Sequence, residues 1–496
     1  MLAAEDRDLS EAVRVIRSSW VPFGIAVLTF LLASPAGISV SKLPPPTLAG
    51  DGGTSHYRLA WGPGQTHLDH VITVVMENRV YDNYFGEYCR TVGPYCSSTG
   101  NGIPAGTCIP RNPSNQSLGC VVPFNLTTSQ FVTSDMPHTW TSGLAAWDHG
   151  AMDGFYVAEG TDGQPLGHYN ASTLPIYWDM AEQYAISDNL FAANLSYSLP
   201  NHWYLVAGQA PNITQSSLLQ SDADRALYLN QSNQTRTIQD VLNHSSVSWM
   251  YYDFALPTWA KATQTGGSAY DFWNPMGARA ESYSSEYAAH FAPRSQFLDD
   301  VANGTLPQIS WVVPFATQSD HPGWNVTAGE SWVAQLVNAV EASPEWNSTA
   351  IFVVWDDYGG WYDHVAPPWY MAKLLSFRSP AIVISPYAKE NYISHQFLTF
   401  FSLLRFVEWQ FKLGCMTPLD CAATLPFDFF DFNQTARPPM YFPTDWTQAT
   451  YPMRLQTAEY TLPDDRSVPN CLACVTISPA NWVDGAPPPR STSLGD

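Results

Sequence analysis

Two adjacent carboxylates, Asp356 and Asp357, interrupt an apolar run in the segment VVWDDYGGWYDHV at residues 353–365. A second apolar run, HVITVVMEN, ends in Glu77 and Asn78. Three carboxylates that converge in a cleft repel one another strongly, and a divalent cation relieves that repulsion. We therefore predict that these three carboxylates and the Asn78 side chain bind a metal ion.

The chemistry of these side chains also restricts the cation and its use. Oxygen ligands favour Mg²⁺, Ca²⁺ or Mn²⁺, whereas imidazoles from His321 or His364 would shift the preference towards Zn²⁺ or iron. Ser198 lies just before a Pro-Asn pair in NLSYSLPNHW, and a helix is expected to begin near Asn201. A cation beside the Ser198 hydroxyl would lower its pKa and neutralise a phosphoryl oxygen, so Ser198 is a candidate nucleophile.

Each of these residues also has an ordinary structural interpretation. A carboxylate after a strand is often a helix cap, and Asp357 before YGG is equally a turn residue. His138 and His202, taken singly, are typical of structural histidines. The catalytic interpretation is favoured because three buried-strand patterns end in compatible metal and nucleophile chemistry.

Three apolar segments must position this chemistry, at residues 70–78, 185–208 and 348–360. Their continuous Val, Ile and Phe runs are typical of strands buried on both faces of a largely parallel sheet. Ligands of such sheets bind beyond the carboxyl ends of the strands, where the three polar clusters would meet. The expected fold is therefore α/β, with a largely parallel central sheet, helices on both faces and loop insertions.

Charge and composition exclude one class of function. The 496 residues carry 44 acids and 22 bases, which gives a formal net charge of -22. Neither a basic run nor a basic stripe is present to follow a phosphate backbone, so we expect no nucleic-acid partner. Hydrophobic residues make up 45% of the chain, which is ample for a folded core.

The N-terminus is the segment that looks like targeting. Arg14 and Arg17 precede an uncharged stretch that continues to Lys42, followed by the Pro-rich KLPPPTL. A membrane helix needs about 20 apolar residues, so residues 1–45 are expected to be a signal peptide or an N-terminal membrane anchor with a linker. Both alternatives predict an extracellular or cell-surface protein.

Two further features agree with that location. Twelve Asn-x-Ser/Thr sites are acceptors for N-linked glycans. The eight cysteines form pairs close in sequence, which suits short-range disulfides. The pairs are Cys89/Cys96, Cys108/Cys120, Cys415/Cys421 and Cys471/Cys474. A zinc site at CLAC, residues 471–474, is a weak alternative because no second ligand pair matches it.

These motifs resemble the phosphoesterase family of acid phosphatases and phospholipases C, a branch of the alkaline-phosphatase superfamily. The resemblance extends from about residue 68 to about residue 435 and includes VVMENRVYDNYFG, SLPNHWYLVAGQ, SDHPGWNVTAGESWV and VVWDDYGGWYDHVAPP. It implies an alkaline-phosphatase-like catalytic domain at 60–435, with an insertion at about 210–305. Residues 436–496 would then be a C-terminal extension with a flexible tail.

The resemblance also implies a role for each residue of the site. Ser198 would be the nucleophile and form a phosphoserine, and His321 or His364 would protonate the leaving oxygen. His138 and Asn201 would bind the substrate. The metal ligands would be Glu77, Asn78, Asp356 and Asp357. The substrate would be a phosphate ester, either a small molecule or a phospholipid headgroup.

Two other functions are weighed against this one. A catalytically inactive cell-surface glycoprotein on the same fold would suit the many glycosylation sites, yet it has no need of clustered acids that destabilise the fold without a cation. A sugar hydrolase would use paired acids but would leave Asn78 and Ser198 without a role.

Overall fold

The computed structural model describes residues 66–89, 100–160, 162–212, 222–253 and 273–452. All of these residues belong to one compact unit, Trp61–Asp496. The predicted signal or anchor segment, Cys96 and the CLAC motif lie outside the described residues. None of the helices in the described ranges has the length and apolar character that a membrane span requires.

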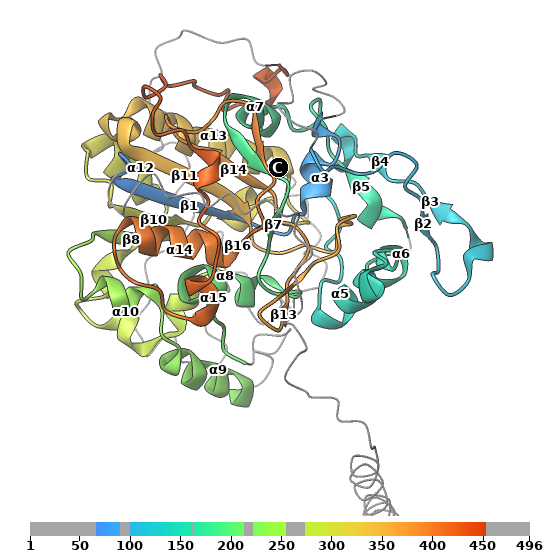
Figure 1. Cartoon of the computed structure of the whole chain (residues 1–496), viewed down its shortest axis with the longest axis horizontal. Helices are drawn as coiled ribbons and strands as arrows, with labels where there is room; N and C mark the ends of the chain where they lie inside the picture. Colours follow the sequence, from blue (N-terminus) through green and yellow to red (C-terminus); the bar gives the residue numbers. More distant parts are fainter. Residues whose placement is uncertain (1–65, 90–99, 161, 213–221, 254–272, 453–496) are drawn as a thin grey trace, which may run out of the picture. The chain divides into compact units, whose positions relative to one another are not determined.

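An eight-stranded sheet with the order β15-β6-β14-β11-β1-β10-β8-β9 forms the centre of the domain (Figure 1). Only β14 runs antiparallel to its neighbours, and the other pairs are parallel. The strands are β1 His70–Met76, β6 Ala185–Ser187, β8 Trp249–Asp253, β9 Phe291–Pro293, β10 Ile309–Val312, β11 Thr349–Trp355, β14 Ala381–Ile384 and β15 Tyr392–Ser394. The prediction of an α/β fold with a largely parallel sheet is confirmed.

The sheet separates two hydrophobic cores, and β1 contributes to both. Ile72 and Val74 pack into one core, while Val71 and Val75 pack into the other. Helices α7 Pro175–Gln183 and α13 Val326–Ala342 supply the first core. Helices α8 Ser198–Ala207 and α14 Phe400–Gln410 supply the second. Burial on both faces explains why these strands are apolar throughout rather than alternating, and the helices lie on both faces as predicted.

The segment predicted as an insertion, residues 210–305, contributes β8 and β9 to one edge of the sheet. It also forms α9 Asp222–Gln234, α10 Ile238–Leu242 and α12 Ser295–Asn303. Among the described aromatic residues of this segment, Trp249, Tyr251 and Tyr252 are buried in the core. The beginning of the segment predicted as a C-terminal extension is held against α13, since Asn338 forms two hydrogen bonds with the Phe442 backbone.

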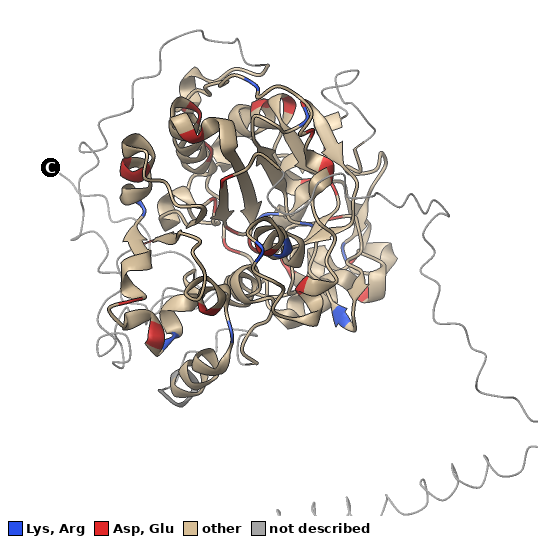
Figure 2. Ribbon diagram, turned by 60° about the vertical axis from the view of Figure 1, so that its left-hand side comes forward, with Lys and Arg blue, Asp and Glu red and all other residues tan. Residues whose placement is uncertain are grey.

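Short elements and disulfides complete the described part of the chain. Cys108–Cys120 and Cys415–Cys421 are disulfides, as predicted from their spacing. The other helices are α3 Tyr81–Phe85, α5 Trp140–Trp147, α6 Phe155–Ala158 and α15 Pro418–Cys421. The other strands are β2 Ile109–Pro110, β3 Cys120–Val121, β4 Phe124–Asn125, β5 Gly167–His168, β7 Leu190–Phe191, β12 Trp369–Tyr370, β13 Lys373–Leu374 and β16 Leu398–Thr399. Figure 2 shows Asp and Glu on many separate elements, so the acidic excess is distributed over the described part of the chain.

Candidate active site

The ends of β1 and β11 bring the predicted metal ligands together. The two strands pair in parallel up to Met76 and Trp355, so the residues that follow leave the sheet side by side. The Asn78 backbone N–H donates to Asp356 Oδ1 at 2.9 Å, and Asn78 has a positive φ of 58°. The four residues brought to this edge are Glu77, Asn78, Asp356 and Asp357, and all of them are buried.

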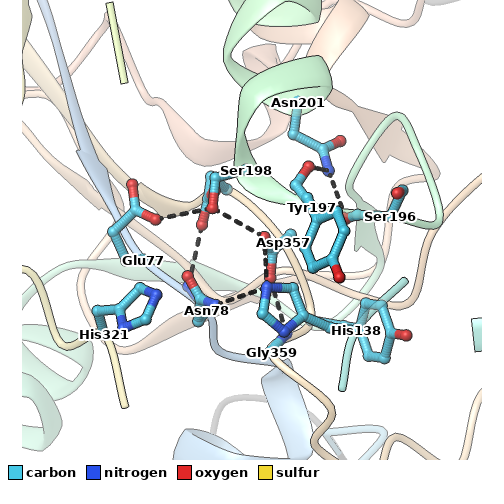
Figure 3. A network of polar contacts seen from close by, with 12 residues as sticks. Glu77, Asn78, His138, Ser196, Tyr197, Ser198, Asn201, His321, Asp357 and Gly359 are labelled. Atoms are coloured by element: carbon cyan, nitrogen blue, oxygen red, sulfur yellow. Dashed lines mark hydrogen bonds and ion pairs between the residues drawn. The ribbon is translucent and has the colours of Figure 1, made fainter. Parts of the chain in front are cut away.

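Ser198 faces two of these carboxylates. Its Oγ lies 3.0 Å from Glu77 Oε2 and 3.1 Å from Asp357 Oδ2 (Figure 3). Asp357 also serves as a turn residue, because its Oδ1 accepts from the Gly359 N–H at 2.7 Å. The two interpretations of Asp357 are therefore compatible, since each uses a different oxygen.

The local structure around Ser198 differs from the prediction in two respects. Helix α8 begins at Ser198 itself and not near Asn201, so the hydroxyl lies in the first helical turn, where backbone N–H groups have no partner within the helix. Residues 185–208 also do not form one strand that leads to the nucleophile. They form β6, the short β7 that pairs with β16 outside the central sheet, and α8.

Asn201 holds the turn before the helix instead of facing the carboxylates. Its Oδ1 accepts from the Asn194 N–H at 2.8 Å, and its Nδ2 donates to the Asn194, Ser196 and Tyr197 carbonyls at 3.0 to 3.3 Å. Both ends of the amide are thus engaged by backbone. These contacts support a role in orienting Ser198, and contact with substrate stays a prediction.

His138 presents one ring nitrogen to the site. Its Nδ1 lies 2.7 Å from the Met136 carbonyl, which requires Nδ1 to carry a proton and to donate. Its Nε2 lies 3.3 Å from Asn78 Nδ2 and 4.0 Å from Asp357 Oδ2. With the ring proton on Nδ1 alone, Nε2 accepts a hydrogen bond from the Asn78 amide and helps to orient it.

His321 follows β10 and reaches the same cluster. Its Nδ1 donates to the Pro322 carbonyl at 2.7 Å, which leaves Nε2 as the nitrogen free of a proton in the neutral ring. Figure 3 shows the ring on the Glu77 side of the cluster. The preceding residue, Asp320, has a φ of 71° and is fully buried, with a pKa raised to about 6 by burial.

Asp320 fixes the loop that carries His321, and this gives a testable expectation. Its Oδ2 accepts from Tyr177 Oη and Trp355 Nε1 at 3.0 Å each. A Cβ on Gly329 would lie 1.8 Å from Asp320 Oδ1. We expect Gly329→Ala to lower the free energy of unfolding by about 1–3 kcal/mol and to reduce turnover by displacing the loop. Urea unfolding and steady-state kinetics measure the two effects.

A matched control for this substitution lies on the same helix. Gln335 is only partly buried on α13, so Gln335→Ala is expected to leave both quantities nearly unchanged. Unaltered stability and kinetics in Gly329→Ala would show that Asp320 does not hold the His321 loop in place.

His364, predicted as an alternative proton donor to the leaving oxygen, makes its described contacts in a different cluster. Its Nδ1 lies 2.7 Å from Asp82 Oδ2 and its Nε2 lies 3.1 Å from Asn101 Oδ1. Arg378 binds Asp82 and also Asp363, whose pKa burial raises to about 6. The structure therefore gives His364 a place in a buried charge network, with no hydrogen bond to the Ser198 cluster among the described contacts.

His202 belongs to the site, although the sequence favoured an ordinary structural role. Its Nε2 lies 3.0 Å from Glu77 Oε1 and 3.6 Å from Asp356 Oδ2. Residues four apart on a helix share a face, and His202 follows Ser198 by four positions. That spacing is the signal in the sequence that identifies it.

Tyr358 and Glu159 form a buried pair next to His138, and no pattern in the sequence predicts this pair. Tyr358 Oη donates to Glu159 Oε1 at 3.1 Å, and the Tyr358 and His138 rings meet edge to face at 6.3 Å. Burial raises the pKa of Glu159 from its ordinary 4.5 to about 8. Glu159 therefore holds a proton at neutral pH in the folded protein, and the unfolded chain releases it.

This proton sets an expected pH dependence of stability. Because the folded-state pKa is raised, the stabilisation is complete below pH 4.5 and is lost as the pH rises towards 8. Glu159→Gln removes this loss, so the stability of the variant relative to the wild type should rise by about 3–4 kcal/mol between pH 5 and pH 8. Urea unfolding at both pH values measures the difference. Glu390→Gln, at an exposed side chain, should show no such gain, and neither should Glu159→Gln if the carboxyl is ionised.

The donor set fits a divalent cation. Glu77, His202 and Asp356 each offer a ligand atom, and the three atoms lie within 4.8 Å of one another. Asp356 Oδ2 is buried and has no hydrogen-bond partner among the described residues. A buried carboxylate oxygen in that position is destabilising unless a cation or proton compensates it. These residues therefore form a candidate metal site.

Known proteins resemble this chain over most of its length. The model of the phosphoesterase family matches residues 68–414. A non-hemolytic phospholipase C of Burkholderia pseudomallei is 25% identical over 396 residues, which cover 70% of this chain and 55% of the relative. Phospholipase C A of Mycobacterium tuberculosis is 27% identical over 369 residues, which cover 66% of this chain and 70% of the relative. The match therefore spans about half the length of the Burkholderia relative.

Solved structures match more weakly. A protein in the alkaline phosphatase superfamily from Vibrio parahaemolyticus is 10% identical with a TM-score of 0.32, covering 61% of this chain and 75% of that chain. Murine ectonucleotide pyrophosphatase/phosphodiesterase 5 is 9% identical with a TM-score of 0.32, covering 52% of this chain and 95% of that chain. The fold assignment accordingly rests on the sheet topology, and the family assignment rests on the match over residues 68–414. The chain belongs to the phosphoesterase family, as its motifs predicted.

Proposed function

We propose that this protein is a metal-dependent phosphoric ester hydrolase that acts outside the cytoplasm through a phosphoserine on Ser198. The observation that carries the proposal is the position of Ser198 Oγ, at 3.0 and 3.1 Å from two carboxylates of the candidate metal site. A purely structural protein gains nothing from a hydroxyl buried among acids at a helix N-terminus. Membership of the phosphoesterase family supports the same reaction class.

The residues would share the reaction as follows. A divalent cation bound by Glu77, Asn78, Asp356 and Asp357 would neutralise phosphoryl oxygens and lower the pKa of the serine hydroxyl. Ser198 Oγ attacks phosphorus, the bond from phosphorus to the leaving oxygen breaks, and phosphoserine remains until water hydrolyses it. The N-terminus of α8, which begins at Ser198, would place the positive end of the helix dipole beside the developing charge.

The three histidines predicted near the phosphoryl group would have different roles. We assign His321 as the general acid: its Nδ1 donates to the Pro322 carbonyl, so in the doubly protonated ring the proton passed to the leaving oxygen would come from Nε2. His138 would orient Asn78 and contact the phosphoryl group. His364 is not assigned a role in this reaction, because it is bound to Asp82.

The relatives favour a lipid substrate over a small monoester. The Burkholderia and Mycobacterium relatives are both named phospholipases C. We therefore propose that the scissile bond is the one between a glycerol oxygen and the phosphorus of a phospholipid headgroup. Attack by Ser198 on the phospholipid would release diacylglycerol first. Hydrolysis of the resulting phosphodiester on Ser198 would then release the phosphorylated headgroup.

An exterior location agrees with several residues of the described domain. Both disulfides require an oxidising compartment to persist. Asn115, Asn125 and Asn303 are exposed glycosylation sites, whereas Asn194 is buried with its Oδ1 bonded to Lys373 at 3.0 Å. We expect glycans at exposed sites and none at Asn194.

A substrate panel tests the proposed function. Full-length protein is stripped with a chelator, reloaded with divalent cations, and assayed on phosphatidylcholine vesicles, an aryl phosphodiester and an aryl phosphate monoester. We expect cation-dependent cleavage, fastest for the phospholipid. Absence of cleavage of all three esters by folded, reloaded protein would support the inactive glycoprotein instead.

A further inference from the structure

His202 occupies a position that the proposed mechanism does not yet use. It is 1% exposed and lies on α8 one turn after Ser198. Its Nε2 points between two carboxylates that come from different strands, at 3.0 Å from Glu77 Oε1 and 3.6 Å from Asp356 Oδ2. The same helix therefore carries both the candidate nucleophile and an imidazole that faces the candidate metal site.

We propose that His202 is a nitrogen ligand of the cation at this site, and that it makes the site prefer a first-row transition metal over Mg²⁺ and Ca²⁺. The inference rests on the proposed function in one respect, namely that the carboxylates bind a cation. It adds a ligand and a metal class that the carboxylates alone do not specify. The geometry that carries it is the set of three donor atoms within 4.8 Å, two oxygens and one nitrogen.

The preference follows from the chemistry of the donors. Carboxylate and amide oxygens alone suit Mg²⁺ and Ca²⁺, which bind imidazole poorly. An imidazole added to two carboxylates suits Mn²⁺, iron or Zn²⁺, and the affinity of such nitrogen and oxygen sites rises along the first transition row. The sequence-based preference for a hard cation omitted His202 from the ligand set, so we revise it towards Mn²⁺, Fe²⁺ or Zn²⁺.

A different role for His202 makes the opposite prediction. A protonated His202 would form an ion pair with Glu77 and Asp356 and would compete with any cation for the same oxygens. Removing such a competitor raises the affinity for every divalent cation. Removing a ligand lowers the affinity for transition metals, by at least about tenfold, and changes the affinity for Mg²⁺ little. The sign of the change separates the two roles.

The experiment uses the full-length protein and three variants. Metal-free wild type, His202→Asn and His202→Gln are dialysed against equimolar Mg²⁺, Ca²⁺, Mn²⁺ and Zn²⁺, and bound metal is measured by elemental analysis. Calorimetric titration with Mn²⁺ and with Mg²⁺ then gives each affinity separately. His70→Asn is the matched control, because His70 is the first residue of β1 and lies at the opposite end of that strand from Glu77, which follows its last residue.

We expect the wild type and His70→Asn to retain Mn²⁺ or Zn²⁺, and both His202 variants to lose that preference by tenfold or more. A wild type that prefers Mg²⁺ or Ca²⁺, variants that keep the transition-metal preference, or variants with raised affinity for all four cations would overturn the inference while leaving the metal site intact. A wild type that binds no cation would refute the metal dependence of the proposed function itself.

A spectroscopic measurement on the wild type tests the same ligand and does not require either His202 variant to fold. Pulsed electron paramagnetic resonance of the Mn²⁺-loaded wild type reports nitrogen coupled to the metal. Coupling from an imidazole is expected, and a spectrum without any nitrogen coupling contradicts a histidine ligand.

Discussion

Ser198→Ala is expected to lower turnover by several orders of magnitude while the protein keeps its bound metal. The substitution removes the only atom that forms the covalent phosphoryl bond in the proposed reaction, so the two-step route is lost. The carboxylates that face Ser198 Oγ are Glu77 and Asp357, and both remain. Steady-state kinetics on the best substrate of the panel and elemental analysis of the same samples measure the two quantities.

Ser196→Ala is the matched control, two residues before the nucleophile. Ser196 is as buried as Ser198, yet its carbonyl is held by Asn201 in the turn before the helix. We expect turnover within a few fold of the wild type. Near-normal turnover of Ser198→Ala, or a severe loss in Ser196→Ala alone, would show that the nucleophile is misassigned.

Asp356→Asn is expected to weaken metal binding and activity together. Asp356 Oδ1 already accepts from the Asn78 N–H, and Oδ2 is the buried oxygen without a hydrogen bond, so the lost charge acts mainly on the cation. We expect metal affinity to fall by at least about a hundredfold. Removal of a residue that only hydrogen-bonds to a metal ligand lowers metal affinity by about 10–100-fold, and loss of a charged ligand should lower it further. Calorimetric titration measures affinity, and kinetics at saturating metal measures what remains.

The metal-free protein provides a second readout for the same substitution. Converging carboxylates repel one another without a cation, so metal-free Asp356→Asn should be at least as stable to urea as the metal-free wild type. Asp69→Asn, at an exposed position before β1, should change neither property. Unchanged metal affinity in Asp356→Asn, or full activity of chelated wild type, would contradict the metal site.

The sequence was sufficient to predict the sheet and the carboxylates because both depend on local pattern and on strand direction. Continuous apolar runs identify strands buried on both faces, and parallel strands must end at the same edge. Glu77 and Asp356 follow such strands directly, so their meeting required no knowledge of side-chain packing. Ser198 was found from its place before a helix, although that helix begins at Ser198 and not three residues later.

The sequence could not place residues beyond the first turn after a strand. Gly359 and Gly360 both have positive φ, and a Cβ on Gly359 would lie 2.3 Å from the Asn78 carbonyl. The chain therefore turns sharply against the residue that follows Glu77, and His364 lies beside Asp82. The order of these residues along the chain is known from the sequence, but the direction of the chain after Gly359 and Gly360 is not.

Asn201 and Glu159 illustrate two other reasons why the sequence did not predict the whole site. An amide near a nucleophile is equally suited to binding substrate or to holding backbone, and the contacts of Asn201 with residues 194–197, which show that it holds backbone, cannot be read from the sequence. Glu159 is far from Tyr358 in sequence, and its raised pKa arises from burial that no local pattern predicts. His202 could be identified from its spacing of four residues from Ser198, but only once the helix was known to begin at Ser198.

The most direct test of the account is to trap the covalent intermediate. Metal-loaded wild type is quenched with acid during turnover of a phosphodiester, digested, and mapped by peptide mass spectrometry, with Ser198→Ala treated in parallel. The account predicts a phosphorylated or phosphodiester-modified peptide with the modification on Ser198 and no modified peptide from the variant. Modification of Ser196, or rapid turnover with no covalent adduct on any serine under conditions that detect a synthetic phosphoserine standard, would contradict it.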